Sequence, residues 1–144
     1  MKIDFYILEN LSAQQSWQYT CQLIEKIHDE QHAIYINAHS HEEAAHLDQL
    51  LWTYREDSFL PHNIYNDNDD FPPLIQIGHS ITPTRHKTTL INLAHEIPIF
   101  SQQFENIVEI VFPGPHMQQL ARDRYRQYRD RGDSLATHKI KELI

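Results

Sequence analysis

The amino-terminal half of the chain alternates short apolar segments with amphipathic segments that begin at helix-capping sequences. Ile3 to Leu8 is rich in β-formers and is followed by Ser12-Ala-Gln-Gln15, a capping box in which serine and glutamine satisfy free N–H groups at a helix start. The pattern repeats, because the apolar segment Ala33 to Ile36 precedes a second box, Ser40-His-Glu-Glu43, and apolar residues at helical spacing. Two consecutive strand-helix units predict parallel strands joined by right-handed crossovers.

Later apolar segments extend this sheet. We expect strands at Leu74 to Ile77, Leu90 to Leu93 and Ile107 to Phe112, and the turn Pro113-Gly-Pro115 leads from the last strand into a helix. This order predicts one α/β domain over residues 1–144, with about five mostly parallel strands between helices on both faces.

The first strand-to-helix turn lacks the glycines that nucleotide-binding α/β proteins use. It contains the sequence Leu8-Glu-Asn-Leu-Ser-Ala-Gln14, and the three glycines of the chain lie far apart, at Gly78, Gly114 and Gly132. They cannot form a G-x-G-x-x-G turn or a P-loop, and Glu9 would repel a pyrophosphate. We therefore expect no nucleotide cofactor.

Eleven histidines raise the question of a metal site, and the run from Asn37 to His46 is the densest. On a helix His41 and His46 lie about 140° apart, whereas the pair in H-E-x-x-H shares one face. We interpret these histidines as loop and cap residues and expect no metal. Cys21 lies on an apolar helix stripe and is expected in the core, and no nucleophile sits in a G-x-S-x-G context. A Ser/His/Asp or paired-carboxylate site stays open.

Basic residues are concentrated near the carboxyl end of an acidic chain. Residues 116–144 carry a net charge of +3 and the preceding 115 residues carry −11, for a total of −8. The acidic part would repel a large nucleic-acid ligand, so we expect a small negative partner. Asp4 falls where a signal peptide would carry its apolar core, and no segment approaches the roughly 20 apolar residues that span a bilayer. The sequence predicts a cytoplasmic protein.

The last helix carries most of these basic residues. At about 100° per residue, its buried stripe is expected to contain Met117, Leu120, Ala121, Arg124 and Tyr128, with Arg124 paired to a carboxylate. Another face carries a basic ridge, which we define as Arg122, Arg126 and Arg129 with Tyr125 beside them; Gln118 shares this face. The alternative is a solvated helix face without a partner.

A second candidate surface follows the second predicted helix. Trp52 ends that helix and Phe59 lies in the loop after it, where large aromatic side chains commonly anchor partner proteins. The alternative is that both side chains belong to the core.

Two segments together resemble a known family, the chi subunits of bacterial DNA polymerase III. They are Leu51-Trp52 with Ser58-Phe-Leu-Pro-His62, and Gln119-Leu-Ala-Arg-Asp-Arg-Tyr-Arg-Gln-Tyr-Arg129, and the likeness extends over nearly the whole chain. The resemblance implies a Rossmann-like three-layer fold that has lost nucleotide binding. It also implies a non-enzymatic subunit of the clamp-loader assembly that acts in DNA replication.

The resemblance further implies two partner surfaces. The psi subunit would bind at Trp52 and Phe59, where an accessory helicase is another candidate. The acidic carboxyl-terminal tail of the single-stranded-DNA-binding protein would bind at the basic ridge, and Val111 and Tyr125 would help to wall a pocket for its terminal aromatic residue. Gln118 stands where the family has a lysine, which would weaken tail binding or change its angle. The tail-site residues expected in this chain are Val111, Gln118, Arg122, Tyr125, Arg126 and Arg129.

Direct binding to nucleic acid or to a membrane is not expected of this acidic chain, whose pI is about 5.7. The alternative function is that of a small α/β enzyme whose arginine cluster binds an anionic metabolite.

Overall fold

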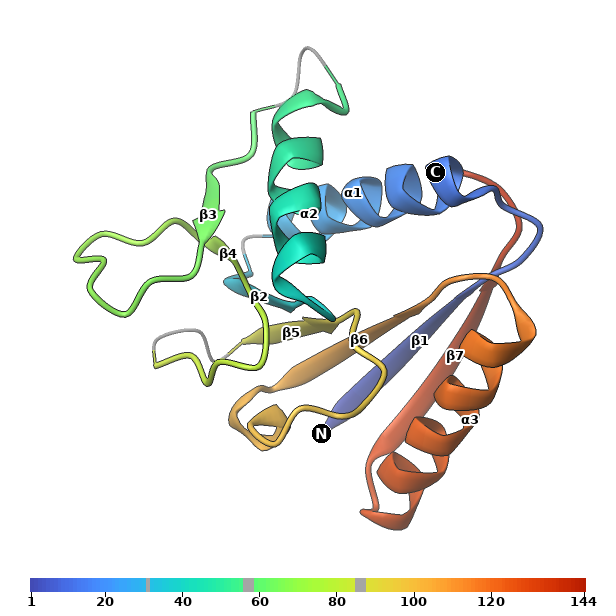
Figure 1. Ribbon diagram of the computed structural model, residues 1–144. Helices are drawn as coiled ribbons and strands as arrows, with labels where there is room; N and C mark the ends of the chain where they lie inside the picture. Colours follow the sequence, from blue (N-terminus) through green and yellow to red (C-terminus); the bar gives the residue numbers. More distant parts are fainter. Residues whose placement is uncertain (31, 56–58, 85–87) are drawn as a thin grey trace.

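The computed structural model describes residues 1–30, 32–55, 59–84 and 88–144, and it has the expected α/β architecture (Figure 1). In the described part, seven strands form one parallel sheet in the order β3-β4-β2-β5-β6-β1-β7. The strands are β1 (Lys2–Leu8), β2 (Ile34–Asn37), β3 (His62–Ile64), β4 (Ile75–Gly78), β5 (Thr89–Asn92), β6 (Asn106–Val111) and β7 (Ser134–Ile140). The helices are α1 (Ala13–Asp29), α2 (His41–Thr53) and α3 (Pro115–Asp130), with a short 3₁₀ helix η1 (Ser101–Gln103). None of the helices in these ranges has the length and apolarity to cross a membrane.

The expectation of about five strands was too low, because both edge strands were missed. β3 has three residues and pairs with β4 alone, so it carries too short a pattern to be recognised. β7 pairs only with β1, and its sequence Ser-Leu-Ala-Thr-His-Lys-Ile mixes polar and apolar residues because one edge stays solvated. Part of the irregular stretch expected after Trp52, residues 56–58, lies outside the described residues.

The first predicted capping box is complete and the second is modified. At α1, the Ser12 side chain accepts from the Gln15 N–H at 3.1 Å, and the Gln15 side chain accepts from the Ser12 N–H at 2.9 Å. At α2, Ser40 accepts from the Glu43 N–H at 3.1 Å, but Glu43 accepts from the N–H of His39, one residue earlier. Both helices still begin where the sequence predicts, because one satisfied N–H group is enough to fix each start.

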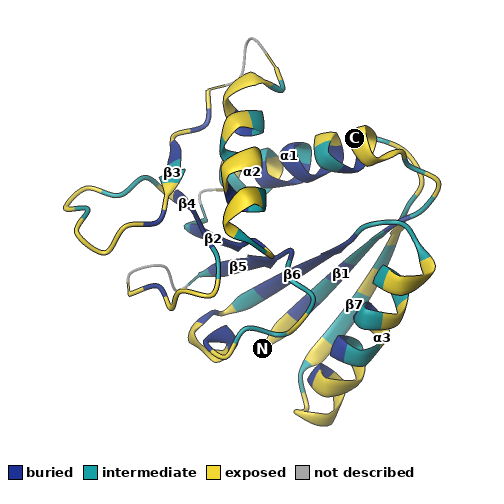
Figure 2. Cartoon of the chain, viewed as in Figure 1, coloured by how far each residue is buried: buried dark blue, intermediate teal, exposed yellow. Residues whose placement is uncertain are grey.

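Helices cover the two faces of the sheet unequally. α1 and α2 pack on one face, and α3 packs on the other over β6, β1 and β7 (Figures 1 and 2). Beyond α3, Phe100 and Phe104 cover the same face, with ring centroids 5.7 and 6.3 Å from that of Tyr35. Cys21 of α1 is fully buried, which confirms its place in the core, and this burial raises the pKa of its thiol to about 12.

Candidate functional site

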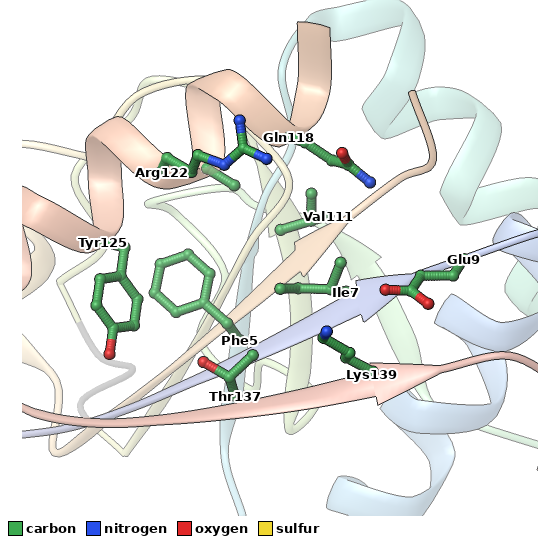
Figure 3. Close-up of a pocket in the computed structure, with 10 residues that line it drawn as sticks. Phe5, Ile7, Glu9, Val111, Gln118, Arg122, Tyr125, Thr137 and Lys139 are labelled. Carbon is green, nitrogen blue, oxygen red and sulfur yellow. The ribbon is translucent and has the colours of Figure 1, made fainter. Parts of the chain in front are cut away.

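A pocket of about 220 Å³ lies between α3 and the β7 end of the sheet (Figure 3). Its floor is apolar and comes from the strands, whereas its polar side chains come from α3, β7 and the residue after β1. It is lined by Phe5, Ile7, Glu9, Val111, Gln118, Ala121, Arg122, Tyr125, Thr137 and Lys139.

The parallel register of three strands builds the floor and one wall. Ile7 of β1 pairs with Val111 of β6 and with Lys139 of β7, so these three residues form one row across the sheet. Phe5 and Thr137 belong to the next row on the same face, because side chains alternate along a strand. These two rows place aliphatic and aromatic side chains at the bottom of the pocket, and they place the aliphatic part of Lys139 at its β7 side.

Helical spacing builds the opposite wall. Gln118, Arg122 and Tyr125 follow one another at intervals of four and three residues, so they lie on one face of α3 above the strands (Figure 3). The Tyr125 ring centroid lies 5.5 Å from that of Phe5, which closes one end of the pocket. Ala121 is buried between helix and sheet, and its small side chain leaves the space open.

The charges of the pocket are two cations and one carboxylate. Arg122 on α3 and Lys139 on β7 are both exposed, and neither has an acidic partner within 4.0 Å among the residues that the structure describes. Glu9 contributes the carboxylate at the end of β1. The pocket therefore offers two accessible positive charges beside an apolar floor, an arrangement suited to an anionic ligand with an apolar part.

A buried polar network fixes α3 to the sheet behind this pocket. Arg124 donates from Nε to Glu109 Oε1 at 3.0 Å and from Nη1 to the His95 carbonyl at 2.9 Å. Tyr128 donates to Glu109 Oε2 at 2.7 Å, and the Asn92 amide donates to the same carboxylate at 3.0 and 3.2 Å. The expected pairing of Arg124 with a carboxylate is confirmed.

Burial raises the pKa of Glu109. The positive charge of Arg124 opposes this rise, and so do the hydrogen bonds that Asn92, Tyr128 and Arg124 donate to the carboxylate. Because every member has a partner, the network is satisfied and holds the helix in one position.

Four of the six residues expected at the tail site line the pocket: Val111, Gln118, Arg122 and Tyr125. The other two, Arg126 and Arg129, are exposed on α3 but do not line it. Arg126 forms an ion pair with Asp123, and Arg129 lies 3.4 Å from Asp130. Sequence reasoning missed the residues of β1 and β7, because the face that a strand presents to a helix depends on a register that the sequence does not show. Those residues are Phe5, Ile7, Thr137 and Lys139, and Glu9 directly after β1 was missed with them.

The second candidate surface lies at the opposite edge of the sheet. Trp52 is 43% exposed and Phe59 is 73% exposed, with ring centroids 5.7 Å apart. The alternative that both side chains belong to the core is therefore wrong. They flank β3, whereas the pocket borders β7, and six strand spacings of about 4.8 Å, about 29 Å in total, separate these strands.

The histidines of the run from Asn37 to His46 diverge. His39 stacks on His95 with ring centroids 3.8 Å apart, and His41 lies 5.6 Å from His79. His46 instead meets the edge of Trp17 at 4.9 Å. In the described ranges no group of three or more His, Cys, Asp or Glu side chains has an arrangement that could bind a metal ion.

Comparison with known proteins gives one consistent result. The family model described as "DNA polymerase III chi subunit, HolC" matches residues 1–136. A protein of Pseudomonas aeruginosa named DNA polymerase III subunit chi is 30% identical over 142 residues, which cover 99% of each chain. Proteins with the same name from Haemophilus influenzae and Escherichia coli are 30% and 28% identical, over 94% and 92% of this chain and 95% and 94% of theirs.

Proposed function

Since the chain belongs to the DNA polymerase III chi subunit family, we propose that it is a non-catalytic subunit of the clamp-loader assembly of that polymerase. In this role it links the psi subunit to the acidic carboxyl-terminal tail of the single-stranded-DNA-binding protein during replication. The pocket under α3 takes the tail, and the surface of Trp52 and Phe59 takes psi.

The observation that carries the tail assignment is the combination of charge and shape in the pocket. Phe5, Ile7 and Val111 supply apolar surface, and Arg122 stands above it without an acidic partner among the described residues. A peptide that ends in an aromatic residue after several aspartates matches both features. Its ring fits against the floor, and its carboxylates accept charge-assisted hydrogen bonds from the guanidinium.

Gln118 changes the expected strength of this interaction. It lines the pocket one helical turn before Arg122, where the resemblance leads us to expect a lysine. A glutamine amide can still donate to a carboxylate but carries no charge, so its hydrogen bond is about half as strong as one from a cation. We therefore expect tail binding in this protein to depend more heavily on the remaining cations.

The assignment of the psi-binding surface rests on the solvent exposure of two aromatic side chains. Trp52 and Phe59 present adjoining aromatic rings to solvent, and exposed aromatic groups of this kind are typical anchors of protein interfaces. An accessory helicase is a second candidate for this surface. Because the pocket and the aromatic pair flank opposite edge strands, both partners can bind at once.

The alternative, a small enzyme that binds an anionic metabolite, finds little support in the composition of the pocket. Its lining in the described part has one carboxylate, Glu9, and contains neither histidine nor cysteine. Acid-base chemistry by paired carboxylates or nucleophilic attack assisted by a histidine would require such groups.

The proposal is tested by titrating the protein with a peptide that ends in Asp-Asp-x-Pro-Phe and, separately, with single-stranded DNA. We expect the peptide to bind with an affinity that falls as salt is added, because charge pairs at an open pocket are screened. We expect no comparable binding of the DNA alone. Tight binding of DNA without peptide binding would refute the proposed role.

A further inference from the structure

Lys139 of β7 stands across the pocket from Arg122. Its register partner Ile7 lies on the floor, and Val111 lies on the far side of Ile7, so the lysine continues this row toward the open edge of the sheet. Figure 3 shows the Lys139 side chain beside Ile7, with Arg122 on the helix above. The apolar floor is therefore flanked by a cation on each wall.

The ion pairs of the described residues set Lys139 and Arg122 apart from three nearby arginines. Arg126 and Arg129 have acidic partners in Asp123 and Asp130, and Arg131 lies 3.3 Å from Asp133. Within the described ranges, neither Arg122 nor Lys139 has such a partner within 4.0 Å. The two cations that line the pocket are thus both free to meet a ligand carboxylate.

We infer that Lys139 is a second anchor for the acidic tail, and that the tail is held between α3 and β7 rather than along the helix alone. This inference rests on the proposed function and adds a specificity residue to it. A terminal side chain on Phe5, Ile7 and Val111 places the carboxylates of the peptide end between the two walls. Lysine suits this position, because its ammonium is a mobile point charge that needs no fixed bidentate geometry.

With Lys139 as an anchor, a site without a cation at position 118 still has two positive charges. Gln118 leaves Arg122 as the one cation that α3 contributes to the lining in the described part, and Lys139 supplies the other from a different element. Recognition then depends on the pairing of β7 with β1, which sets Lys139 beside Ile7.

Calorimetry with the Asp-Asp-x-Pro-Phe peptide tests this inference, with Lys141→Ala as the matched control. Lys141 is exposed two residues after Lys139 and does not line the pocket, so both changes remove one positive charge from the same region. We expect Lys139→Ala to weaken binding by about fivefold to tenfold and to reduce its salt dependence. Lys141→Ala should stay within about twofold of the unmodified protein, because distant exposed charges are screened. Lys139→Arg, which keeps the charge, should restore most of the affinity.

The possible results separate this inference from the function on which it rests. If Arg122→Ala weakens binding and Lys139→Ala does not, the second anchor is refuted and the tail assignment stands. Equal losses in Lys139→Ala and Lys141→Ala would also refute it, since net charge alone would then explain the effect. If the peptide fails to bind the unmodified protein, both the proposed function and the inference are wrong.

Discussion

Arg124 and Glu109 form a buried ion pair at 3.0 Å that joins α3 to β6 directly behind the pocket. Arg124 lies two residues from Arg122, yet the first is buried and the second is exposed. One helix therefore uses arginine in two ways, as an internal anchor and as a group presented to a partner. The buried Arg124 fixes the position of α3 and therefore the position of the exposed Arg122.

Loss of the anchor should destabilise the whole fold. Arg124→Ala leaves the Glu109 carboxylate buried without its cation, and breaking such a pair typically costs about 3–5 kcal/mol in the free energy of unfolding. Arg126→Ala is the matched control, because its pair with Asp123 is exposed and should be worth at most about 1 kcal/mol. Urea unfolding of both variants measures the difference, and equal stabilities would contradict a structural role for Arg124.

The aromatic surface should be separable from the pocket. Phe59→Ala removes an exposed ring, so we expect an unchanged melting temperature but loss of co-purification with psi, at a cost of about 2 kcal/mol or more. Affinity for the tail peptide should not change, since residues much more than about 10 Å apart rarely couple. Ile99→Ala, at a position that is 97% exposed on another segment, should retain both partners. Loss of peptide binding in folded Phe59→Ala would show that the two sites overlap.

Neutralising Glu9 should strengthen tail binding. Its carboxylate lines the pocket and repels an acidic ligand, and a like charge at an open site is worth about 1 kcal/mol, or about fivefold in affinity. Glu9→Gln should therefore bind the peptide more tightly in fluorescence polarisation. Glu142→Gln removes an exposed carboxylate that does not line the pocket, and it should have little effect. Weaker binding in Glu9→Gln would mean that Glu9 orients the ligand instead.

His95, whose backbone carbonyl accepts a hydrogen bond from Arg124, should make the stability of the fold depend on pH. Burial lowers the pKa of His95, and His39, Arg124 and His116 lower it further, against an opposite effect of Glu96. The unfolded chain then binds a proton at His95 first as pH falls through about 6.5, so the stability present above that pH is lost below it. We expect His95→Asn to show a smaller fall in melting temperature between about pH 7.5 and about pH 5.5. An identical fall in both proteins would exclude His95 as a contributor.

Local rules predicted the central part of the fold. Ser12 and Ser40 start helices where the capping sequences place them, and the apolar segments that begin at Ile3 and Ile107 form the interior strands β1 and β6. These elements are dictated by their own residues. The edge strand β7 is not, because its alternating pattern is weak and its position depends on backbone pairing with β1.

The pocket also combines residues that the local sequence groups together with residues that only the strand order brings to them. Gln118, Arg122 and Tyr125 could be grouped from helical spacing alone. Lys139 and Glu9 could not be added, because they meet that helix only through the strand order β6-β1-β7. The helical pattern could not predict that Arg126 and Arg129 lie outside the pocket. It predicts which residues are exposed, but not which exposed residues border a cavity.

Isothermal titration of the tail peptide into the unmodified protein and into Arg122→Ala tests most directly whether this pocket binds the acidic tail. Arg122 is exposed, lines the pocket and has no acidic partner within 4.0 Å in the described part, so its loss should leave the fold intact. We predict that binding weakens by about 1.5–3 kcal/mol, the usual worth of a hydrogen bond to a charged group. Unchanged affinity in a folded Arg122→Ala protein would contradict the assignment of this pocket to the acidic tail.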